Sequence, residues 1–152
     1  MTKEQALQKL KHYCGYQERC HSEVKEKLYS LGVWNKDHDE IISSLIEEGH
    51  LNEERFAIAF AGGKFRMKQW GKVKIKYELK QKQVSEYSIK KALKQIDEEE
   101  YIKTVSELAK DKYESLKKEQ RLVRKKKTTD YLLQKGYEHD LISKMLTAIT
   151  ES

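Results

Sequence analysis

Residues 79–96 read LKQKQVSEYSIKKALKQI, and this stretch returns 53 residues later with the same apolar spacing. The matched positions are Leu79 and Leu132, Val84 and Tyr137, Ile89 and Ile142, and Leu93 and Leu146. An earlier copy fits the same frame after a three-residue insertion in the loop from Trp34 to Asp39, and its positions are Leu28, Val33, Ile41 and Leu45. Each copy has a helix that ends in Leu, a turn with an apolar residue, and a second helix. Self-similarity at this period indicates a tandem helical repeat.

The repeat predicts an all-α protein built from three-helix units. Apolar residues also recur at helical spacing before each copy, and they supply the third helix of each unit. The predicted units cover residues 1–50, 51–97 and 98–152. With no Pro and only 7 Gly in 152 residues, the chain lacks the turn-rich composition of an all-β sandwich or barrel. Because tandem units pack mainly against their neighbours, we expect three repeats in an elongated, curved arrangement.

Single residues indicate where several helices begin and end. Gly32 and Gly136 follow predicted helices at the position where a left-handed residue ends them, and Gln83 stands at the corresponding place in the second unit. A long helix is predicted from Glu98 to Ser115, with carboxylates at its start that complement the helix dipole.

Two polar segments suit structural roles. His38 lies in a predicted loop, where it fits the start of a helix better than general-base catalysis. Glu53, Glu54 and Arg55 begin the predicted fourth helix. They are either helix-start residues or residues at a junction between repeats, and both explanations stay open.

The composition indicates a soluble cytoplasmic protein. No stretch approaches the roughly 20 apolar residues of a membrane span, so no membrane partner is expected. Residues 1–11 have no apolar signal core. Cys14 and Cys20 are the only cysteines, and no disulfide framework is predicted. Together with His12 and His21 they do not have the spacing of a structural zinc site, so we expect no metal.

Charge is distributed unevenly along the chain. Residues 1–60 carry 8 basic and 11 acidic side chains, whereas residues 61–128 carry 21 and 10. Two basic runs, over residues 64–82 and 117–127, contain one acidic residue each. Like charges at helical spacing repel, so their retention favours a polyanionic partner such as nucleic acid. The candidate contact residues are Lys64, Arg66, Lys68, Trp70, Lys72, Lys74, Lys76, Arg121, Arg124, Lys125 and Lys126.

Aromatic residues lie within the first basic run. Phe65 and Tyr77 are expected to be core anchors, whereas Trp70 is equally compatible with burial and with stacking on an unpaired base. No catalytic arrangement is recognisable, because Gly62 and Gly63 lack the rest of a phosphate-binding loop and no nucleophile–base spacing is present. The sequence therefore favours a binding protein, and none of its motifs supports an enzyme.

The central segment contains GHLNEERFA at 49–57, Phe65-Arg66, Trp70-Gly71-Lys72 and residues 76–79. This combination resembles the signature of the bacterial RecX proteins, which regulate the recombinase RecA. The first repeat agrees, with Ala6, Leu7 and Leu10 followed by the helix opening at 20–24 and Gly32. Cys20 stands where a capping Ser is common, and Gln83 replaces a Gly; these are departures from the family pattern.

The resemblance implies three tandem three-helix repeats in a curved, all-helical protein. It also implies binding in the deep groove of the RecA filament on single-stranded DNA, with contacts to DNA and with duplex DNA left open as a second partner. Inhibition of ATP hydrolysis, strand exchange and filament growth would follow. We expect a monomer without a cofactor. Two other classes fit the residues: a general nucleic-acid-binding helical module without a recombinase partner, and a structural adaptor whose basic runs are only solvated faces.

Overall fold

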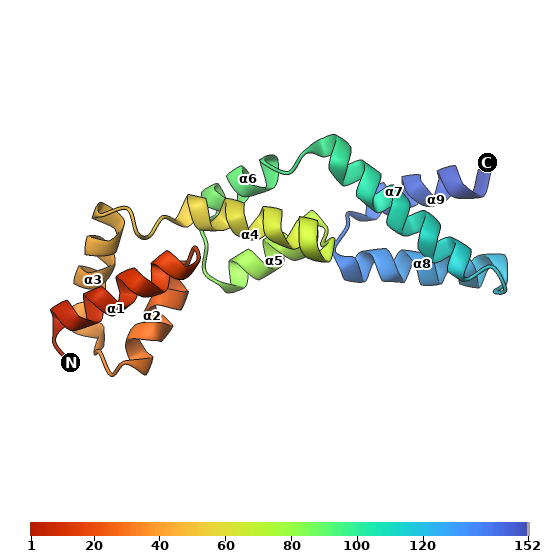
Figure 1. Cartoon of the computed structure of the whole chain (residues 1–152). Helices are drawn as coiled ribbons and strands as arrows, with labels where there is room; N and C mark the ends of the chain where they lie inside the picture. Colours follow the sequence, from red (N-terminus) through yellow and green to blue (C-terminus); the bar gives the residue numbers. More distant parts are fainter. Residues whose placement is uncertain (152) are drawn as a thin grey trace. The chain divides into compact units, whose positions relative to one another are not determined.

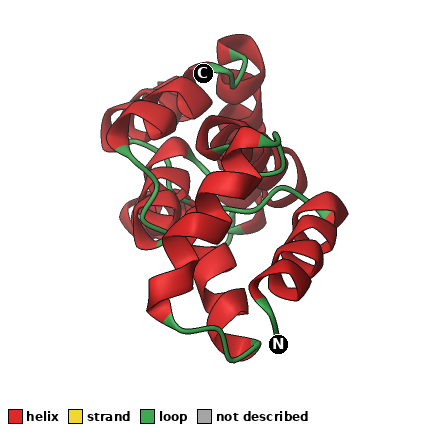
Figure 2. Cartoon of the chain, turned by 90° about the vertical axis from the view of Figure 1, so that its left-hand side faces the viewer, coloured by secondary structure: helices red, strands yellow, loops and turns green. Residues whose placement is uncertain are grey.

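The computed structural model describes residues 1–151, and every regular element within them is a helix (Figures 1 and 2). The helices of this part of the chain are α1 (Lys3–Tyr16), α2 (His21–Ser30), α3 (Asn35–Glu47), α4 (Glu53–Lys68), α5 (Lys72–Gln81), α6 (Glu86–Lys94), α7 (Glu98–Ser115), α8 (Arg121–Lys135) and α9 (His139–Glu151). The predicted all-α class is confirmed. The limits of α7 agree with the predicted helix, and the Asp97 side chain caps its start by accepting from the backbone N–H of Glu100 (3.0 Å).

The helices form three groups of three, and the middle helix of each group ends in the same turn. The backbone N–H of Val33 donates to the carbonyl oxygen of Leu28 over 3.0 Å. The corresponding pairs of the other two groups, each at 3.1 Å, are Val84 with Leu79 and Tyr137 with Leu132. One residue with positive φ precedes the donor in every case: Gly32 (78°), Gln83 (64°) and Gly136 (98°). This Schellman-type ending explains why the apolar pattern of the sequence repeats.

The third helix of the first group begins earlier than the sequence indicates. The predicted loop that contains His38 is instead the first turn of α3, which starts at Asn35. The three-residue insertion therefore lengthens the helix rather than the loop. His38 is buried, and its Nε2 lies 2.9 Å from the carbonyl oxygen of Val33, so the ring packs within the core.

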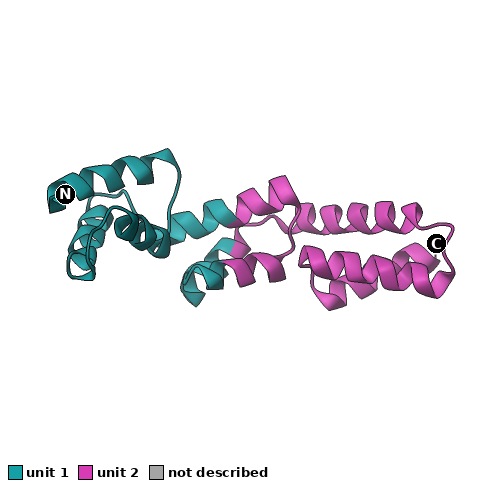
Figure 3. Cartoon of the chain, turned by 90° about the horizontal axis from the view of Figure 1, so that it is seen from below, with its two compact units in different colours: residues 1–60, 79–92 teal, residues 61–78, 93–152 magenta. Residues whose placement is uncertain are grey.

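The described chain forms two compact units (Figure 3). One unit contains Met1–Phe60 and Leu79–Ala92, and the other contains Ala61–Glu78 and Leu93–Ser152. The second helix group is therefore divided, because α4 begins in the first unit and ends in the second, whereas α5 does the reverse. The repeat boundaries at 1–50, 51–97 and 98–152 stay a prediction.

Each unit contains one junction between neighbouring helix groups. In the first unit the Ser22 hydroxyl donates to the carbonyl oxygen of Lys82 (2.9 Å), and Lys82 Nζ lies 3.3 Å from Glu23. In the second unit the backbone N–H of Gly71 donates to the carbonyl oxygen of Lys135 (2.8 Å). Lys82 and Lys135 are 53 residues apart and occupy the same position of the repeat. The same carbonyl thus serves as the acceptor in both junctions.

The acidic start of α4 has a structural role. Burial alone would raise the pKa of Glu53, but the hydroxyls of Ser85 and Ser88 donate to its carboxylate and bring the pKa below its ordinary value. Arg55 pairs with Glu18 and also donates to the carbonyl oxygen of Gly49 (3.0 Å). Both side chains join segments that are distant in sequence. The Arg55–Glu18 pair joins the first and second helix groups and favours the junction explanation for Arg55, whereas the Glu53 bonds link α4 to the start of α6 within the second group.

The two cysteines are buried and free. Burial raises the pKa of both thiols. Cys20 precedes α2, and the Glu23 carboxylate accepts from the Cys20 backbone N–H (3.0 Å), while the Cys20 sulfur accepts from the Glu23 backbone N–H, so a capping box forms without a Ser. Among residues 1–151, no helix combines the length and apolar character needed to cross a membrane.

Candidate nucleic-acid interface

The first basic run lies around the turn between α4 and α5. Phe65 and Ile75 are buried on either side of this turn. Gln69 adopts φ 57° to end α4, and Gly71 then passes the backbone of Gly136 so closely that an added Cβ would lie 2.3 Å from its carbonyl oxygen. The turn is therefore defined by backbone packing, and its charged side chains are attached to a fixed frame.

Trp70 lies within this turn between two lysines. The Nζ atoms of Lys64 and Lys74 lie 5.1 Å and 4.7 Å from the centroid of its ring system. The ring is half-buried, so part of it packs on the protein and part stays accessible, and stacking on a base stays a prediction. Cations at these distances are attracted to the ring face.

Arg66 and Lys68 are exposed in the last turn of α4. Their charges complement the negative end of the helix dipole, so these two residues also stabilise α4. No carboxylate within the described chain lies at ion-pairing distance from either of them, and both heads remain available to a ligand.

Lys72 differs from its neighbours, because its side chain already contacts other residues of the protein. Its Nζ lies 3.1 Å from Glu98 and 4.5 Å from the ring centroid of Tyr101, and only 22% of its side chain is exposed. Its backbone N–H donates to the Tyr101 hydroxyl (2.8 Å), which in turn donates to Glu138. Burial and the bond to Glu138 raise the pKa of Tyr101 well above its ordinary range. Lys72 is mainly part of the junction.

Tyr77 is exposed, contrary to the expectation that it is a core residue, because 60% of its surface is accessible. It lies two positions from each of the buried residues Ile75 and Leu79, and two positions on a helix turn a side chain to the opposite face. Phe65 is buried as expected. Lys76, which precedes Tyr77, is exposed on the same helix.

The structure adds one residue that does not stand out in the sequence. Lys135 ends α8, and its Nζ donates to the carbonyl oxygen of Lys68 (3.1 Å), although the two are 67 residues apart. The repeat offered a signal for it, because Lys135 matches Lys82 in the frame. We call the resulting surface the basic turn, and its members are Lys64, Arg66, Lys68, Trp70, Lys72, Lys74, Lys76 and Lys135.

The second basic run is more strongly neutralised within the fold. The Arg124 guanidinium lies 3.7 Å from the ring centroid of Tyr113, and its Nε donates to the carbonyl oxygen of Tyr113 (2.7 Å). Lys126 pairs with Asp130 at 3.0 Å. Arg121 is exposed and Lys125 is half-buried. These four residues lie in the first two turns of α8, apart from the basic turn.

The basic turn and the four basic residues at the start of α8 lie near opposite ends of that helix. Lys125 and Lys135 are ten residues apart on one straight helix, which corresponds to about 15 Å along its axis. Figure 1 shows the C-terminal end of α8 beside the turn between α4 and α5, and its N-terminal end beside the end of α7. The eleven candidate residues therefore form two separate clusters. Within the described residues, no group of three His, Cys, Asp or Glu side chains is arranged as a metal site.

Comparison with protein families gives two matches. The second three-helix domain of RecX matches residues 52–93, and the third three-helix domain of RecX matches residues 98–146. The regulatory protein RecX of Bacillus cytotoxicus is 30% identical over 139 residues, which are 91% of this chain and 52% of the relative. The regulatory protein RecX of Bacillus thuringiensis is 27% identical over 86% of this chain and 48% of its own length. The chain spans about half the length of these curated relatives.

Two solved structures share the arrangement of the helices. The crystal structure of RecX from Lactobacillus salivarius superposes with a TM-score of 0.88 at 22% identity, over 99% of this chain and 97% of that one. A second crystal structure, of a regulatory protein RecX, has a TM-score of 0.86 at 20% identity and covers 95% of this chain and 71% of that one. At this level of identity the likeness shows a common fold built from repeated three-helix groups.

Proposed function

The chain belongs to the RecX family of regulatory proteins, and on that basis we propose that it binds the RecA filament on single-stranded DNA and inhibits it. The bound protein would suppress ATP hydrolysis, strand exchange and filament growth. This role places it in homologous recombination, DNA repair and the SOS response, and hence in the cytoplasm. It acts as a monomer and requires no cofactor.

The basic turn is the observation that carries the proposal. It brings side chains from α4, α5 and α8 together on a backbone frame that is held by the Gly71–Lys135 hydrogen bond. Cations placed in this way release counterions from a phosphate backbone, and a half-buried Trp among them offers a stacking face for a base. The cluster at the start of α8 supplies a second contact, in which Arg121 and Lys125 are the members without a carboxylate partner among residues 1–151.

The first experiment is ATP hydrolysis by the cognate RecA on single-stranded DNA. The chain is added at ratios below those that coat the DNA. Inhibition at these ratios means that the protein acts on the filament. Inhibition only at saturation means competition for phosphate, and the general nucleic-acid-binding module would then be the better account. No inhibition and no DNA binding at moderate salt would leave only the structural adaptor.

A charge reversal tests whether the basic turn is responsible. Arg66→Glu with Lys68→Glu changes two exposed cations, and we expect at least about tenfold weaker filament binding, because each loses a phosphate contact and adds a repulsion. Lys90→Glu with Lys94→Glu is the matched control, since it makes the same charge change on the exposed side of α6. Equal losses for both pairs, measured by fluorescence anisotropy at fixed salt, would remove the basic turn from the proposal.

A further inference from the structure

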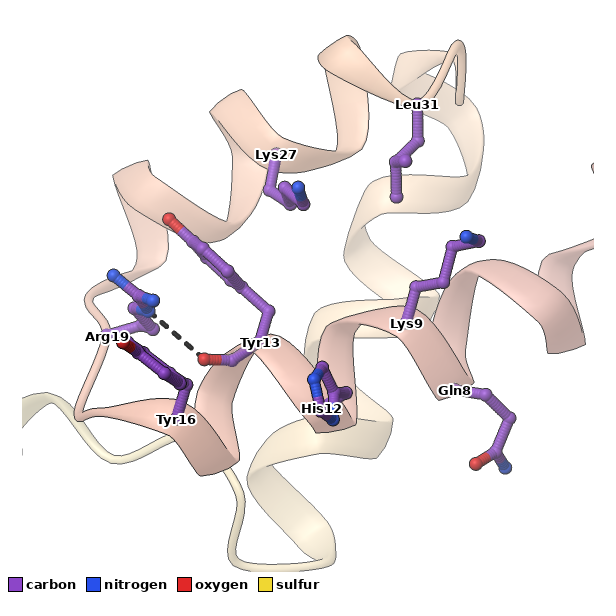
Figure 4. A pocket seen from close by; sticks show the side chains of 8 residues that line it. All are labelled: Gln8, Lys9, His12, Tyr13, Tyr16, Arg19, Lys27 and Leu31. Carbon is purple, nitrogen blue, oxygen red and sulfur yellow. Dashed lines mark hydrogen bonds between the residues drawn. The ribbon is translucent and has the colours of Figure 1, made fainter.

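A groove between α1 and α2 lies outside both basic clusters (Figure 4). It has a volume of about 440 Å³, which is enough for one nucleotide, and Leu31 is its aliphatic lining residue. We call it the α1–α2 groove, and the residues that define its chemistry are Lys9, His12, Tyr13, Tyr16, Arg19 and Lys27. Figure 4 shows these side chains coming from α1, from α2 and from the link between them.

The groove is cationic although its part of the chain is acidic. None of the described residues that line it is a carboxylate. Within residues 1–151, neither Lys9, Arg19 nor Lys27 has an acidic side chain at ion-pairing distance. Residues 1–60 carry an excess of acidic side chains, so a groove free of them is a local separation of charge. Such a site is complementary to an anion.

Two tyrosines give the groove flat apolar surfaces beside these cations. The Arg19 guanidinium lies 3.8 Å from the ring centroid of Tyr13, and its Nε donates to the carbonyl oxygen of Tyr13 (3.1 Å). The stacked guanidinium is thereby oriented, and its terminal nitrogens keep their capacity to donate to a phosphate. The ring of Tyr16 is 81% exposed, which leaves a face for stacking.

The same pairing of cation and aromatic ring recurs where the first two helices of every group meet. In the third group Arg124 stacks on Tyr113 and donates to its carbonyl oxygen, as Arg19 does on Tyr13. In the second group the ring comes from the link between the helices and the cations come from the helices themselves. There Lys64 of α4 and Lys74 of α5 lie over Trp70. Two of these three sites belong to the clusters already assigned to nucleic acid. The third of these sites, the Arg19–Tyr13 pair of the first group, lies in the α1–α2 groove.

We propose that the α1–α2 groove binds one nucleotide of a single strand of DNA. A base stacks on the exposed Tyr16 ring, and the adjoining phosphate is held by Arg19 with Lys9 and Lys27. This ligand uses both properties of the groove, whereas an acidic peptide would use only the charge. The inference rests on the proposed function for the identity of the ligand, but its test reads DNA contact directly.

Photocrosslinking tests the stacking. The full chain is irradiated with a thymidine oligonucleotide that carries 5-iodouracil, and crosslinked peptides are identified by mass spectrometry. We expect crosslinks at Tyr16 or Tyr13. Tyr16→Ala should abolish the crosslink at position 16 and weaken oligonucleotide binding at least about fivefold, because one stacked base is lost. Crosslinks confined to Trp70 and Tyr77 would overturn the proposal.

A pair of double variants tests the phosphate contact. Lys9→Gln with Lys27→Gln removes two groove cations, and Lys25→Gln with Lys36→Gln removes two exposed cations of the same helix group that do not line the groove. We expect the groove variant alone to make the dependence of log Kd on log salt shallower by about one. Equal slopes for the two variants would overturn the proposal.

Two further outcomes separate this proposal from others. Loss of polyglutamate binding in the groove variant, with oligonucleotide binding unchanged, would mean that the groove takes an acidic peptide and would overturn the inference. Crosslinks at Tyr16 in a chain that leaves RecA unaffected would support the inference while rejecting the proposed function. Inhibition of RecA without any crosslink in the groove would support the proposed function and overturn the inference.

Discussion

At the scale of single residues, Gln83 carries a conformational cost that its counterparts avoid. Its φ of 64° lies in the left-handed region, where Gly32 and Gly136 stand in the other helix groups. A side chain at such a position costs roughly 1 kcal/mol. We therefore predict that Gln83→Gly raises the free energy of unfolding by about 0.5–1 kcal/mol, measured by urea denaturation.

The matched control for this change is Gln134→Gly. Gln134 is exposed within α8, so a glycine there should lower the free energy of unfolding by about 0.5–1 kcal/mol. The same substitution thus has opposite signs at the two sites. A loss of stability in Gln83→Gly would show that its side chain contributes more than the backbone strain costs.

Residue-scale inference from the sequence succeeds where backbone geometry demands one residue type. Gly32 and Gly136 have the positive φ that their positions predict. It fails for Tyr77, because a basic neighbourhood contains no information on which helix face is buried until Ile75 and Leu79 are seen to share the inner one. For His38 it succeeds in part, because the residue lies at the start of a helix as expected, but the predicted loop around it is already the first turn of α3.

At the scale of elements, the approach of α5 to the end of α8 depends on Gly71. An added Cβ would lie 2.3 Å from the carbonyl oxygen of Gly136 and 2.5 Å from the next backbone nitrogen, and backbone atoms cannot move aside as a side chain can. We predict that Gly71→Ala lowers the free energy of unfolding by about 2 kcal/mol or more, measured by thermal or urea denaturation.

Gly63→Ala is the control within the same unit. Gly63 lies inside α4, and no other side chain or distant backbone atom comes within 4 Å of the place where an alanine methyl group would lie. The change should therefore raise the free energy of unfolding by about 0.5–1 kcal/mol. Hydrogen exchange would locate the damage in Gly71→Ala at the backbone N–H groups of residues 71 and 73, which donate to the end of α8. Uniform exchange across the chain would contradict a local junction.

Element boundaries are predictable where sequence signals act locally. Asp97 caps α7, and the whole helix can be outlined from its cap and its apolar spacing. The start of α3 is not evident from the sequence, because Trp34 is not a capping residue and the extra turn lies within a polar stretch. The three-residue insertion can be detected by comparison of the repeats, but its structure depends on the packing of His38 against Tyr29.

At the scale of the whole molecule, buried phenols make stability depend on alkaline pH. Burial, and for Tyr101 the bond to Glu138, raise the pKa values of Tyr101 and Tyr137 above the ordinary value near 10. Above that pH the unfolded chain releases protons that the folded chain retains. Stability is therefore unaffected by these groups below about pH 10 and falls above it, by about 1.4 kcal/mol per pH unit for each tyrosine. The buried thiols add a loss of the same sign from about pH 9.

Tyr137→Phe isolates one of these contributions. The variant loses the hydrogen bond to the carbonyl oxygen of Gln69, so it should be about 1 kcal/mol less stable at pH 7. Between pH 10 and 12 its stability should fall less steeply than that of the parent, by about 1.4 kcal/mol per pH unit. Identical slopes in Tyr137→Phe and the parent would contradict the assignment.

The candidate site is only partly predictable at this scale. The two basic runs can be found by counting charges, but their separation along α8 requires the fold. Lys135 lies in a segment of negative net charge, and so does the α1–α2 groove. Averages over a segment hide a cation that folding brings to a cluster, and they hide a groove whose described lining contains no carboxylate.

The shared acceptor carbonyl of Lys82 and Lys135 has a consequence for how such a chain can grow. The second helix group, which lies between the other two in the described chain, holds both halves of this coupling. The acceptor at the end of its middle helix bonds to the group before, and the donors near the start of that helix bond to the group after. A chain built from such groups can gain a further group by gene duplication, because the added group brings its own acceptor and donors. A change in the number of helix groups therefore leaves the hydrogen bonds between groups intact. A substitution at an acceptor or donor position, in contrast, is carried into every group that is later duplicated from the altered one.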